Sequence, residues 1–433
     1  MTLPVWLLYL VLSEKARTGI WQKLGHYTTE QQQAFQHIRE LNPKRPCVWF
    51  HAVSVGEFNA IRYLLDSLSR YPVSLCVSTT TRTGQALARK ICPPEIPVFF
   101  FPFDLVPVIE RTLAMVHPQL LVLTETELWP NVLDRVARWA GVPVLLINGR
   151  ISPSSFRGYC WLKPLLAELL PCLSHAYMQS EKDAERLIQL GALPEKVTPV
   201  GNIKFDIPRQ HQPDLLADYR QRFGIVPEDL VLICASTHEG EDALMLEAYT
   251  RLKTDFPELK LILAPRHPER SAKIQKLLNN RAIRFSLRSR LDEQHYSVAS
   301  VILLDTIGEL SVLYGLATLA VIGGSFIPKG GQNPLEALRQ GVPVVFGPHM
   351  FNFSDISRLI LEYHAGFQVN DLDDLVNTLT ALLTQPEKYN NIVENGQHLL
   401  DANQGTRRFL LEAILSHLGL LDALPEAEKA LTT

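Results

Sequence analysis

A repeated alternation of short apolar runs with segments of helical period constrains the fold of this chain more than any other feature. From residue 47 onward, each apolar run is followed by a polar turn and then by a helix-period segment. Runs that are apolar on both faces are typical of parallel strands covered by helices. The strands predicted for the first half are residues 48–53, 73–78, 98–101, 120–123, 142–147, 176–179 and 197–200.

The pattern restarts in the second half, and this restart indicates two domains. The strands predicted there are residues 230–235, 260–264, 301–304, 319–322, 342–346 and 367–369. Residues 201–213, which include Pro208 and Pro213, are the best linker candidate. A length of 433 residues also suits two or three domains. We therefore expect an α/β protein with two doubly wound Rossmann-like domains that face a central cleft, and a helical tail over residues 371–421.

The net charge and the cysteines indicate which kinds of partner and which cellular compartment suit this protein. The net charge is −3 and the pI is near 6.5, so no global basic field exists for a nucleic acid backbone. This argues against a dedicated DNA or RNA binder. None of the six cysteines forms a CxxC pair, and most lie in apolar runs, which indicates a reducing, cytoplasmic setting.

Residues 3–12 form an apolar run that contains Trp6 and Tyr9. As a helix this run would extend about 15 Å, half of a hydrocarbon layer about 30 Å thick, so it cannot cross a membrane alone. A signal peptide is not indicated, because no basic segment precedes the run and no small-residue cleavage site follows it. Residues 1–50 contain six Lys or Arg and three Glu, which favours an interfacial anchor on an anionic leaflet. A helix packed on its own domain is the alternative.

Familiar cofactor signatures are absent from the sequence. No GxxxxGK occurs, since Lys329 precedes Gly330 and Gly331, and no GxGxxG follows the first strand. This argues against a kinase, a P-loop ATPase and an ordinary dehydrogenase. No Cys or His spacing indicates zinc, because the His238-Glu239 pair has no second histidine four residues on. We therefore expect no metal.

The turns that follow the predicted strands carry the candidate site residues, because ligands of doubly wound sheets bind at the carboxyl ends of the strands. Glu57 follows the first strand, where helix amides and the helix dipole favour a carboxylate, and Gly56 lets a substrate approach the backbone. An acid in the first turn of a helix is also common for structural reasons. His51 is expected to be a hydrogen-bonded core residue or a residue that supports the site from behind.

Two further turns of the first half contain charged residues. Glu125 and Glu127 follow the fourth strand, and we expect one of them to be functional and the other to cap a helix. Lys204 lies at the end of the predicted first domain. Its ammonium group can meet an anionic substrate or neutralise charge that develops during a reaction, and the alternative is a surface ion pair with Asp206.

The second half has four turns suited to anions, which indicates a nucleotide-binding domain. Residues 236–237 follow its first strand at a helix start, where backbone amides can hold a phosphate. Arg266 follows its second strand and offers a planar guanidinium to a phosphate or carboxylate. Residues 308–310 start another helix. A glycine-bracketed loop over residues 323–336 ends at Glu336, whose carboxylate suits a ribose diol.

Nine segments distributed over nearly the whole chain carry a resemblance to a known family. In chain order they are HAVSVGE, TETELWPN, NGRIS, GNIKFD, STHEGE, PRHPER, GELSVLYG, GGSF with GGQNPLEA, and GPHMFNF. With these segments the chain resembles the 3-deoxy-D-manno-octulosonate (Kdo) transferases of lipopolysaccharide synthesis, which are inverting glycosyltransferases of the GT-B fold. Their consistent order makes the resemblance specific.

The resemblance assigns roles to individual residues. The general base of the family falls on Glu57, and its second carboxylate and its motif lysine fall on Glu127 and Lys204, both regarded as supporting the transition state. Its nucleotide contacts fall on Pro265, Arg266, Gly308, Glu309, Leu310, Asn333, Pro334, Leu335 and Glu336. Gln332 stands where the family usually has histidine, which puts in doubt any role that needs an imidazole there.

The implied reaction transfers Kdo from CMP-Kdo to a hydroxyl of a lipid A precursor, lipid IVA, with Glu57 as general base and CMP as leaving group. The implied domains are a membrane-associating segment over residues 1–24, an acceptor-binding domain over residues 25–205, and a CMP-sugar-binding domain with the C-terminal helices over residues 206–433. The implied setting is the cytoplasmic face of the inner membrane, with no metal and no nucleic acid. Rival readings are another GT-B enzyme, such as a UDP-sugar transferase or epimerase, and a non-catalytic nucleotide-sugar binding protein.

Overall fold

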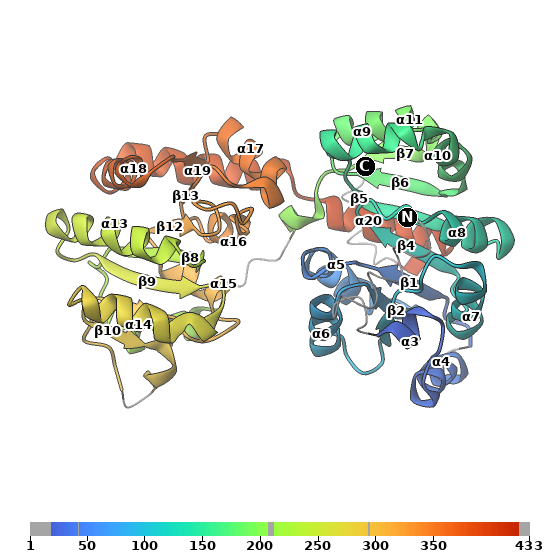
Figure 1. The fold of residues 1–433 in the computed structure, drawn as a ribbon, viewed down its shortest axis with the longest axis horizontal. Coiled ribbons are helices and arrows are strands. Elements are labelled where there is room, and N and C mark those ends of the chain that lie inside the picture. Colours follow the sequence, from blue (N-terminus) through green and yellow to red (C-terminus); the bar gives the residue numbers. More distant parts are fainter. Residues whose placement is uncertain (1–18, 42, 207–211, 293–294, 424–433) are drawn as a thin grey trace, which may run out of the picture. The chain divides into compact units, whose positions relative to one another are not determined.

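The computed structural model describes residues 19–41, 43–206, 212–292 and 295–423 (Figure 1). These residues form two compact units, one of residues up to Asp206 together with those from Asn403 onward, and the other of residues 212–402. The apolar run at residues 3–12 and part of the expected linker lie outside the described residues. Each unit contains one parallel sheet of seven strands, which confirms the expected α/β class with two doubly wound domains.

The sheet of the first unit has the strand order β3-β2-β1-β4-β5-β6-β7, and all neighbouring strands pair in parallel. Its strands are β1 (Cys47–His51), β2 (Ser74–Thr79), β3 (Val98–Phe100), β4 (Leu120–Thr124), β5 (Val144–Gly149), β6 (His175–Met178) and β7 (Val197–Pro199). All seven strands predicted for this half are confirmed, with bounds that differ by at most two residues.

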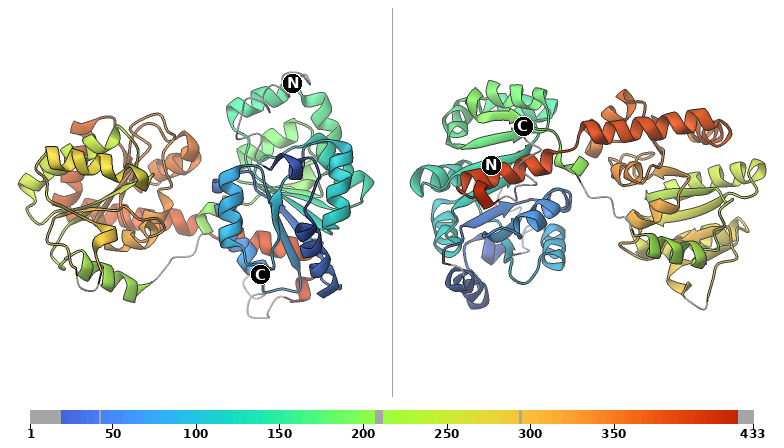
Figure 2. Two further views of the ribbon diagram at one scale, coloured as in Figure 1. Left: turned by 60° about the horizontal axis from the view of Figure 1, so that its bottom comes forward. Right: turned by 180° about the vertical axis from the view of Figure 1, so that it is seen from behind.

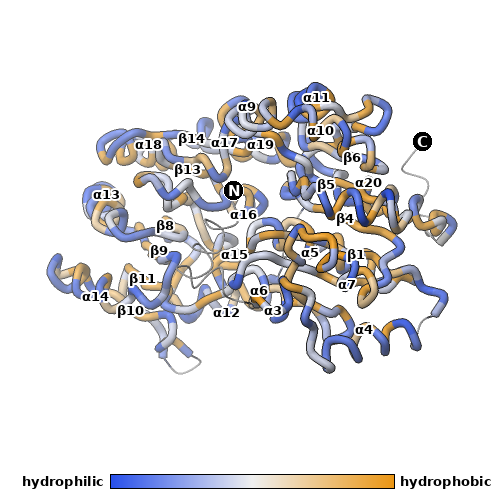
Figure 3. Tube along the Cα trace, turned by 45° about the vertical axis from the view of Figure 1, so that its right-hand side comes forward, coloured by the Kyte–Doolittle hydropathy of each residue, from blue (hydrophilic) through white to orange (hydrophobic). Residues whose placement is uncertain are grey.

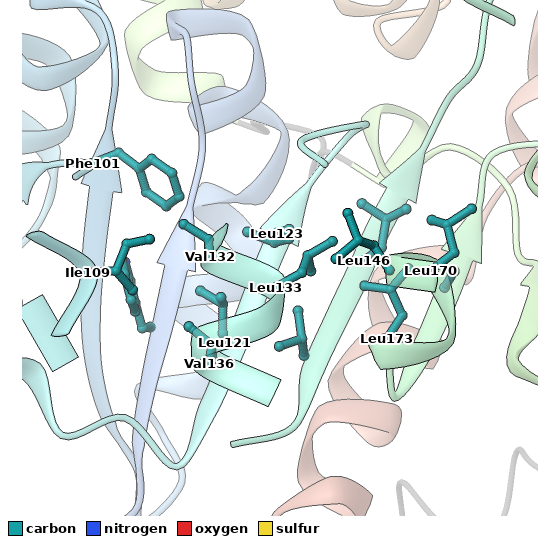
Figure 4. Packing of buried hydrophobic residues seen from close by; sticks show 14 of the residues in the cluster. Phe101, Ile109, Leu121, Leu123, Val132, Leu133, Val136, Leu146, Leu170 and Leu173 are labelled. Carbon is teal, nitrogen blue, oxygen red and sulfur yellow. The ribbon is translucent and has the colours of Figure 1, made fainter. Parts of the chain in front are cut away.

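Helices cover both faces of this sheet. They are α3 (Ile20–Lys23), α4 (Thr29–Leu41), α5 (Val55–Leu68), α6 (Arg82–Ile91), α7 (Val106–Val116), α8 (Pro130–Leu133), α9 (Pro153–Trp161), α10 (Lys163–Leu169), α11 (Glu181–Gln189) and α20 (Thr406–His417). Because side chains alternate across a strand, Phe50 and Val122 are buried in a cluster with α5 and α20, whereas Trp49 and Leu121 are buried in a cluster with α7 and α8. Figure 4 shows Leu121 in the second of these clusters. This two-sided burial explains the apolar runs of the sequence.

The sheet of the second unit has the order β10-β11-β9-β8-β12-β13-β14 and is also parallel throughout. Its strands are β8 (Val231–Thr237), β9 (Lys260–Pro265), β10 (Phe285–Leu287), β11 (Val301–Leu303), β12 (Leu319–Ile322), β13 (Val344–Phe346) and β14 (Gly366–Gln368). The six predicted strands are confirmed, and β10 was not predicted. This edge strand is only three residues long, and Arg284 and Arg288 flank it, so it has no apolar run to detect.

The second unit also has helices on both sides of its sheet (Figures 1 and 2). They are α12 (Pro213–Arg222), α13 (Glu241–Asp255), α14 (Ser271–Asn280), α15 (Leu310–Leu313), α16 (Leu335–Arg339), α17 (Ser354–Glu362), α18 (Leu372–Thr384) and α19 (Pro386–Ala402). Helices such as α13 carry both polar and apolar positions, whereas strands such as β4 are largely hydrophobic (Figure 3). The tail predicted to be helical is confirmed as α18, α19 and α20.

The last helix corrects one expected domain boundary. Residues 206–433 were expected to form the second domain, but α20 belongs to the first unit. Leu410 and Ile414 of α20 are buried against the first sheet, and the Asp206 carboxylate accepts hydrogen bonds from the backbone N–H groups of Gly405 at 2.9 Å and Arg407 at 2.6 Å. The apolar period of α20 is equally compatible with either sheet, so the sequence pattern could not assign it.

None of the helices in the described ranges combines the length and the hydrophobicity that a membrane-spanning helix needs.

Candidate active site

The first unit brings the predicted glutamates to one place on the edge of its sheet. The chain leaves β1 toward β2 on one side, and it leaves β4 toward β5 on the other, so the strand order reverses between β1 and β4. These two strands pair in parallel, with His51 opposite Leu123, so the turns after them are neighbours. Ligands of doubly wound sheets bind at such a reversal. Glu57 follows β1, and Glu125 and Glu127 follow β4.

The Glu57 side chain is held at the N-terminus of α5. Ser54 is the N-cap residue of this helix, and its hydroxyl donates to Glu57 Oε1 at 2.9 Å while accepting from the Glu57 N–H. Glu57 Oε2 accepts from the Val53 N–H at 2.7 Å. This arrangement is close to a capping box, so Glu57 also has the structural role that acids often have in a first helical turn.

The surroundings of Glu57 also change its acidity. Burial and the negative charge of Glu125, together with the smaller effect of Glu127, raise the pKa of Glu57 to about 8, although the hydrogen bonds from Val53 and Ser54 oppose this rise. A carboxyl group that titrates near neutral pH can accept a proton during a reaction and release it afterwards. A cap alone does not need this property.

Lys204 pairs with Glu125 and not with Glu127. Its Nζ lies 3.0 Å from Glu125 Oε1, and both side chains are about three-quarters buried, with exposed fractions of 21% and 26%. Glu125 has a left-handed backbone with φ of 60°, which is uncommon outside glycine and is frequent at functional turns. The alternative of an ion pair between Lys204 and Asp206 is not observed, since Asp206 binds the start of α20.

A chain of hydrogen bonds positions Lys204. The Lys204 N–H donates to Asn202 Oδ1 at 3.0 Å, and Asn202 Nδ2 donates to Gln179 Oε1 at 3.0 Å. Gln179 Nε2 donates to the Asn148 carbonyl at 3.0 Å, and Asn148 Oδ1 accepts from the Ile203 N–H at 3.1 Å. The ends of β5 and β6 thus orient the segment that carries Lys204. Sequence reasoning did not single out Asn148, at the end of β5, or Gln179, directly after β6, although both lie at the edge where ligands bind.

Glu127 lies beside two aromatic residues. Its Oε2 accepts from Trp129 Nε1 at 2.8 Å, and burial, then the charge of Glu125, raise the pKa of Glu127 to about 7. Tyr159 of α9 is close enough that the charge of Glu127 adds to burial in raising the pKa of the phenol. Neither Glu125 nor Glu127 caps a helix among the described elements, so the expectation that one of them would be a cap is wrong.

His51 is a core residue, as expected. Its ring is buried and stacks on Phe101 with centroids 3.6 Å apart, and Nδ1 hydrogen-bonds to the Ser78 carbonyl at 3.1 Å. Burial lowers the pKa of His51 to about 3, so the ring is neutral.

The second unit has a corresponding reversal of strand order between β8 and β12. Glu241 joins the turn after β8 to the loop after β12 through hydrogen bonds, although no sequence pattern marked it as a site residue. Its side chain is buried and accepts from the N–H groups of His238 at 2.8 Å, Gly324 at 2.7 Å and Phe326 at 3.0 Å. The glycine-bracketed loop after β12 is therefore fixed against the turn after β8.

The predicted nucleotide contacts lie on neighbouring turns, because β11, β9, β8 and β12 are adjacent in the sheet. Pro265 ends β9, and the Arg266 side chain after it is exposed to solvent. Gly308 has φ of 93°. Glu309, which precedes α15, accepts from Tyr219 Oη at 2.8 Å and from Arg288 Nη2 at 2.8 Å, so its carboxylate is already held by protein groups.

The run from Asn333 to Glu336 leads into α16. Asn333 Oδ1 accepts from the Leu335 N–H at 3.2 Å, and its Nδ2 lies 3.4 Å from Glu336 Oε1. Gln332 has its Nε2 3.3 Å from His238 Nε2. Within the described parts of the chain, no group of three or more His, Cys, Asp or Glu side chains is arranged to hold a metal ion.

Comparisons with known proteins identify the family of this chain. A family model described as 3-deoxy-D-manno-octulosonic-acid transferase (kdotransferase) matches residues 18–207. The 3-deoxy-D-manno-octulosonic acid transferase of Haemophilus influenzae is 33% identical over 375 residues, which cover 86% of this chain and 87% of that protein. A bifunctional glycosyltransferase/methyltransferase of Fusobacterium nucleatum is 34% identical over 375 residues, and this chain spans just over half of its length, 56%.

Among solved structures, the UDP-GlcNAc 2-epimerase of Neisseria meningitidis bound to UDP-GlcNAc is similar with a TM-score of 0.60 and 15% identity, over 86% of this chain and 100% of that chain. This likeness concerns the fold alone. With two parallel sheets of this kind, the fold class is GT-B.

Proposed function

Because the chain belongs to the 3-deoxy-D-manno-octulosonic acid (Kdo) transferase family and is therefore a glycosyltransferase, we propose that it transfers Kdo from CMP-Kdo to a hydroxyl of a lipid A precursor. The reaction inverts the anomeric configuration and releases CMP. The observation that supports this proposal most is the Glu57 carboxyl group, whose pKa is raised to about 8 at a sheet edge that it shares with Glu125, Glu127 and Lys204.

Glu57 is the proposed general base. The acceptor hydroxyl oxygen attacks the anomeric carbon of Kdo, the bond from that carbon to the phosphate oxygen of CMP breaks, and the hydroxyl proton passes to Glu57. For this step Glu57 must be ionised and within about 3 Å of the hydroxyl. A base with a raised pKa holds the transferred proton more strongly, which favours the forward step.

Lys204 and Glu127 are proposed to support the transition state. Lys204 neutralises Glu125 beside the base, so one fewer uncompensated negative charge lies where the carboxylate group of Kdo must approach. The Trp129 N–H holds the Glu127 carboxylate, and burial together with the negative charge of Glu125 raises the pKa of Glu127.

The second unit is proposed to bind the CMP part of the donor. CMP leaves as a phosphate monoester, so negative charge grows on its phosphate during the reaction. The exposed Arg266 guanidinium suits that charge. Glu336 suits the ribose diol. We propose no metal, because a donor with one phosphate offers no diphosphate chelate.

The protein is proposed to act at the cytoplasmic face of the inner membrane, where the segment over residues 1–24 holds it on an anionic surface. Attachment would confine enzyme and insoluble acceptor to the same surface, so that a three-dimensional search becomes a two-dimensional one.

The proposed reaction predicts a defined product. Purified full-length protein incubated with CMP-Kdo and tetraacylated lipid A precursor in detergent is expected to give acceptor that is heavier by whole Kdo residues, as measured by mass spectrometry. The same yield is expected after EDTA treatment. CMP should also raise the thermal midpoint more than UDP does. No product with fresh donor would contradict the proposal, and stabilisation by UDP-sugars instead would favour the UDP-sugar alternative.

The proposed attachment predicts a change in fractionation. Deletion of residues 1–12 is expected to move protein from the membrane fraction to the soluble fraction, while CMP still raises the thermal midpoint of the truncated chain as it does for the full chain. Unchanged membrane association after the deletion would remove the proposed role of this segment.

A further inference from the structure

The segment that carries Lys204 packs against helix α20 of the same unit. Lys204 lies in a short 3-10 helix, Ile203–Asp206. Its chain neighbours Ile203 and Phe205 are each only 1% exposed, and Ile203 belongs to the hydrophobic cluster that contains Leu410 of α20. A lysine side chain is long and flexible, so the position of its ammonium group depends on the backbone that carries it. The contact with α20 therefore helps to place the ammonium group of Lys204.

Asp206 joins this 3-10 helix to the start of α20 by hydrogen bonds. Its Oδ1 accepts from the Gly405 N–H at 2.9 Å, and its Oδ2 accepts from the Arg407 N–H at 2.6 Å. The Thr406 hydroxyl donates to the Val200 carbonyl at 2.7 Å. The N-cap residue of α20 is Gly405, which has no side chain to cap the helix. The Asp206 carboxylate therefore caps α20 from 199 residues away in the chain.

The two segments approach each other so closely that glycine is needed at one position. Gly201 has a left-handed backbone with φ of 93°, and a Cβ atom there would lie 2.7 Å from Thr406 Oγ1. Hydrogen bonds from N–H groups to a carboxylate are directional and stronger than those between neutral groups, so Asp206 fixes this approach more strictly than apolar packing does. Asp206 is only partly buried, so its removal loosens the contact without leaving a cavity in the hydrophobic core.

We propose that Asp206 is a positioning residue for the transfer reaction, because its cap on α20 fixes the 3-10 helix and so keeps the Lys204 ammonium group at Glu125. This inference rests on the proposed function, in which Lys204 neutralises Glu125 beside the base. Asp206 acts through Lys204 and does not contact a substrate. Without the cap the 3-10 helix shifts, and a displacement of about 1 Å at a catalytic group can lower a rate by about 10²-fold.

Replacing Asp206 with alanine removes the cap and leaves Lys204 in the chain. We expect kcat to fall by about 10- to 100-fold. We also expect the rise of kcat/KM with pH to move about one unit higher. Glu125 and Glu127 are the charged groups that raise the pKa of Glu57, and the effect of Glu125 grows once its ammonium partner has moved away. A lower kcat with an unchanged pH profile would overturn the proposal, because lost stability alone does not change the acidity of Glu57.

A milder variant covers the case in which the alanine variant is unstable. Asp206→Asn keeps one acceptor oxygen for the start of α20, so both effects are expected in the same direction and smaller. The wild-type pH profile together with a lowered kcat in this variant would also contradict the proposal.

Asp371 offers a matched control in the second unit. It is the N-cap residue of α18, and its Oδ1 accepts from the Asp374 N–H at 2.9 Å. Asp371→Ala removes a helix cap of the same kind, so it should lower the thermal midpoint but keep the wild-type kcat and pH profile. Equal changes of kcat and pH profile in Asp371→Ala and Asp206→Ala would show a general effect of lost caps and would remove the specific role of Asp206.

A double change tests whether Asp206 acts through Lys204. Lys204→Ala already removes the ammonium group, so adding Asp206→Ala should lower kcat by less than about twofold more. Losses that multiply in the double variant would show that the two residues act independently, against the proposal.

Amide hydrogen exchange separates this inference from the proposed function, because it needs no turnover. In Asp206→Ala we expect faster exchange at residues 201–206 as well as at residues 405–410, whereas Asp371→Ala should affect only the start of α18. Unchanged exchange at residues 201–206 would overturn the proposal. Absence of Kdo transfer by the wild-type protein would contradict the proposed function, and the exchange measurement would still decide whether Asp206 holds the segment of Lys204.

Discussion

Replacing Glu57 with glutamine is expected to lower kcat by about 10²- to 10⁴-fold, the usual contribution of a general base. Glutamine has nearly the same shape and can still accept one of the hydrogen bonds from Val53 and Ser54, but it cannot take the proton of the acceptor hydroxyl. The measurement is product formation at saturating CMP-Kdo and acceptor. The thermal shift caused by CMP should remain at its wild-type value.

Asp374 offers a matched control for this change. It occupies the same position in α18 that Glu57 has in α5, and its Oδ2 accepts from the Asn370 N–H at 3.0 Å. Asp374→Asn therefore perturbs the same kind of helix cap in the second unit, and it should keep full activity. Near wild-type turnover in Glu57→Gln would eliminate Glu57 as the base, and equal losses in both variants would point to a general loss of stability.

The second large effect is a rise of kcat/KM with pH. Glu57 acts only when ionised, and burial together with Glu125 raises its pKa to about 8 in the free protein. Because kcat/KM reports the free enzyme, it should increase about tenfold per pH unit up to about pH 8 and then level off. Glu127→Gln should move this rise to lower pH, since the charge of Glu127 also raises the pKa of Glu57. A profile that is flat between pH 6 and 8 would contradict the role of Glu57.

The same shift affects stability, with a defined sign. The pKa of Glu57 is about 8 in the folded protein and 4.5 for an ordinary glutamate, so the folded state binds more protons between these values. The contribution of Glu57 to stability is therefore fully present below pH 4.5 and is lost as pH rises through 8, at up to about 1.4 kcal/mol per pH unit. Denaturant unfolding of Glu57→Gln should lack this part of the pH dependence, and an unchanged slope would show that Glu57 titrates normally.

Much of the fold was accessible to sequence reasoning because parallel strands covered on both faces must be apolar along their whole length. Short runs bounded by turns, such as residues 120–123 and 319–322, are typical of such strands, and their order along the chain then predicted the two doubly wound domains. The turns after β1 and β4 could be selected for the same reason, since the carboxyl ends of strands are where such sheets bind ligands.

Other parts of the site depend on contacts that no local pattern contains. Lys204 lies 79 residues from Glu125, and Glu241 lies 83 residues from Gly324. The partner of Lys204 was expected to be an anionic substrate or Asp206, and only the folded backbone, with Glu125 in a left-handed conformation, selects Glu125. The raised pKa of Glu57 likewise needs the burial and the neighbouring charges that the sheet edge creates.

The sequence by itself determined the two parallel sheets and the residues that follow their strands, because hydrophobic period and turn position are local properties of a chain. Only the tertiary structure decided which of those residues meet and that α20 packs on the first sheet. Those outcomes depend on which side chains are buried and on the distances between charged groups. Both are fixed only when segments that are distant in the sequence pack together.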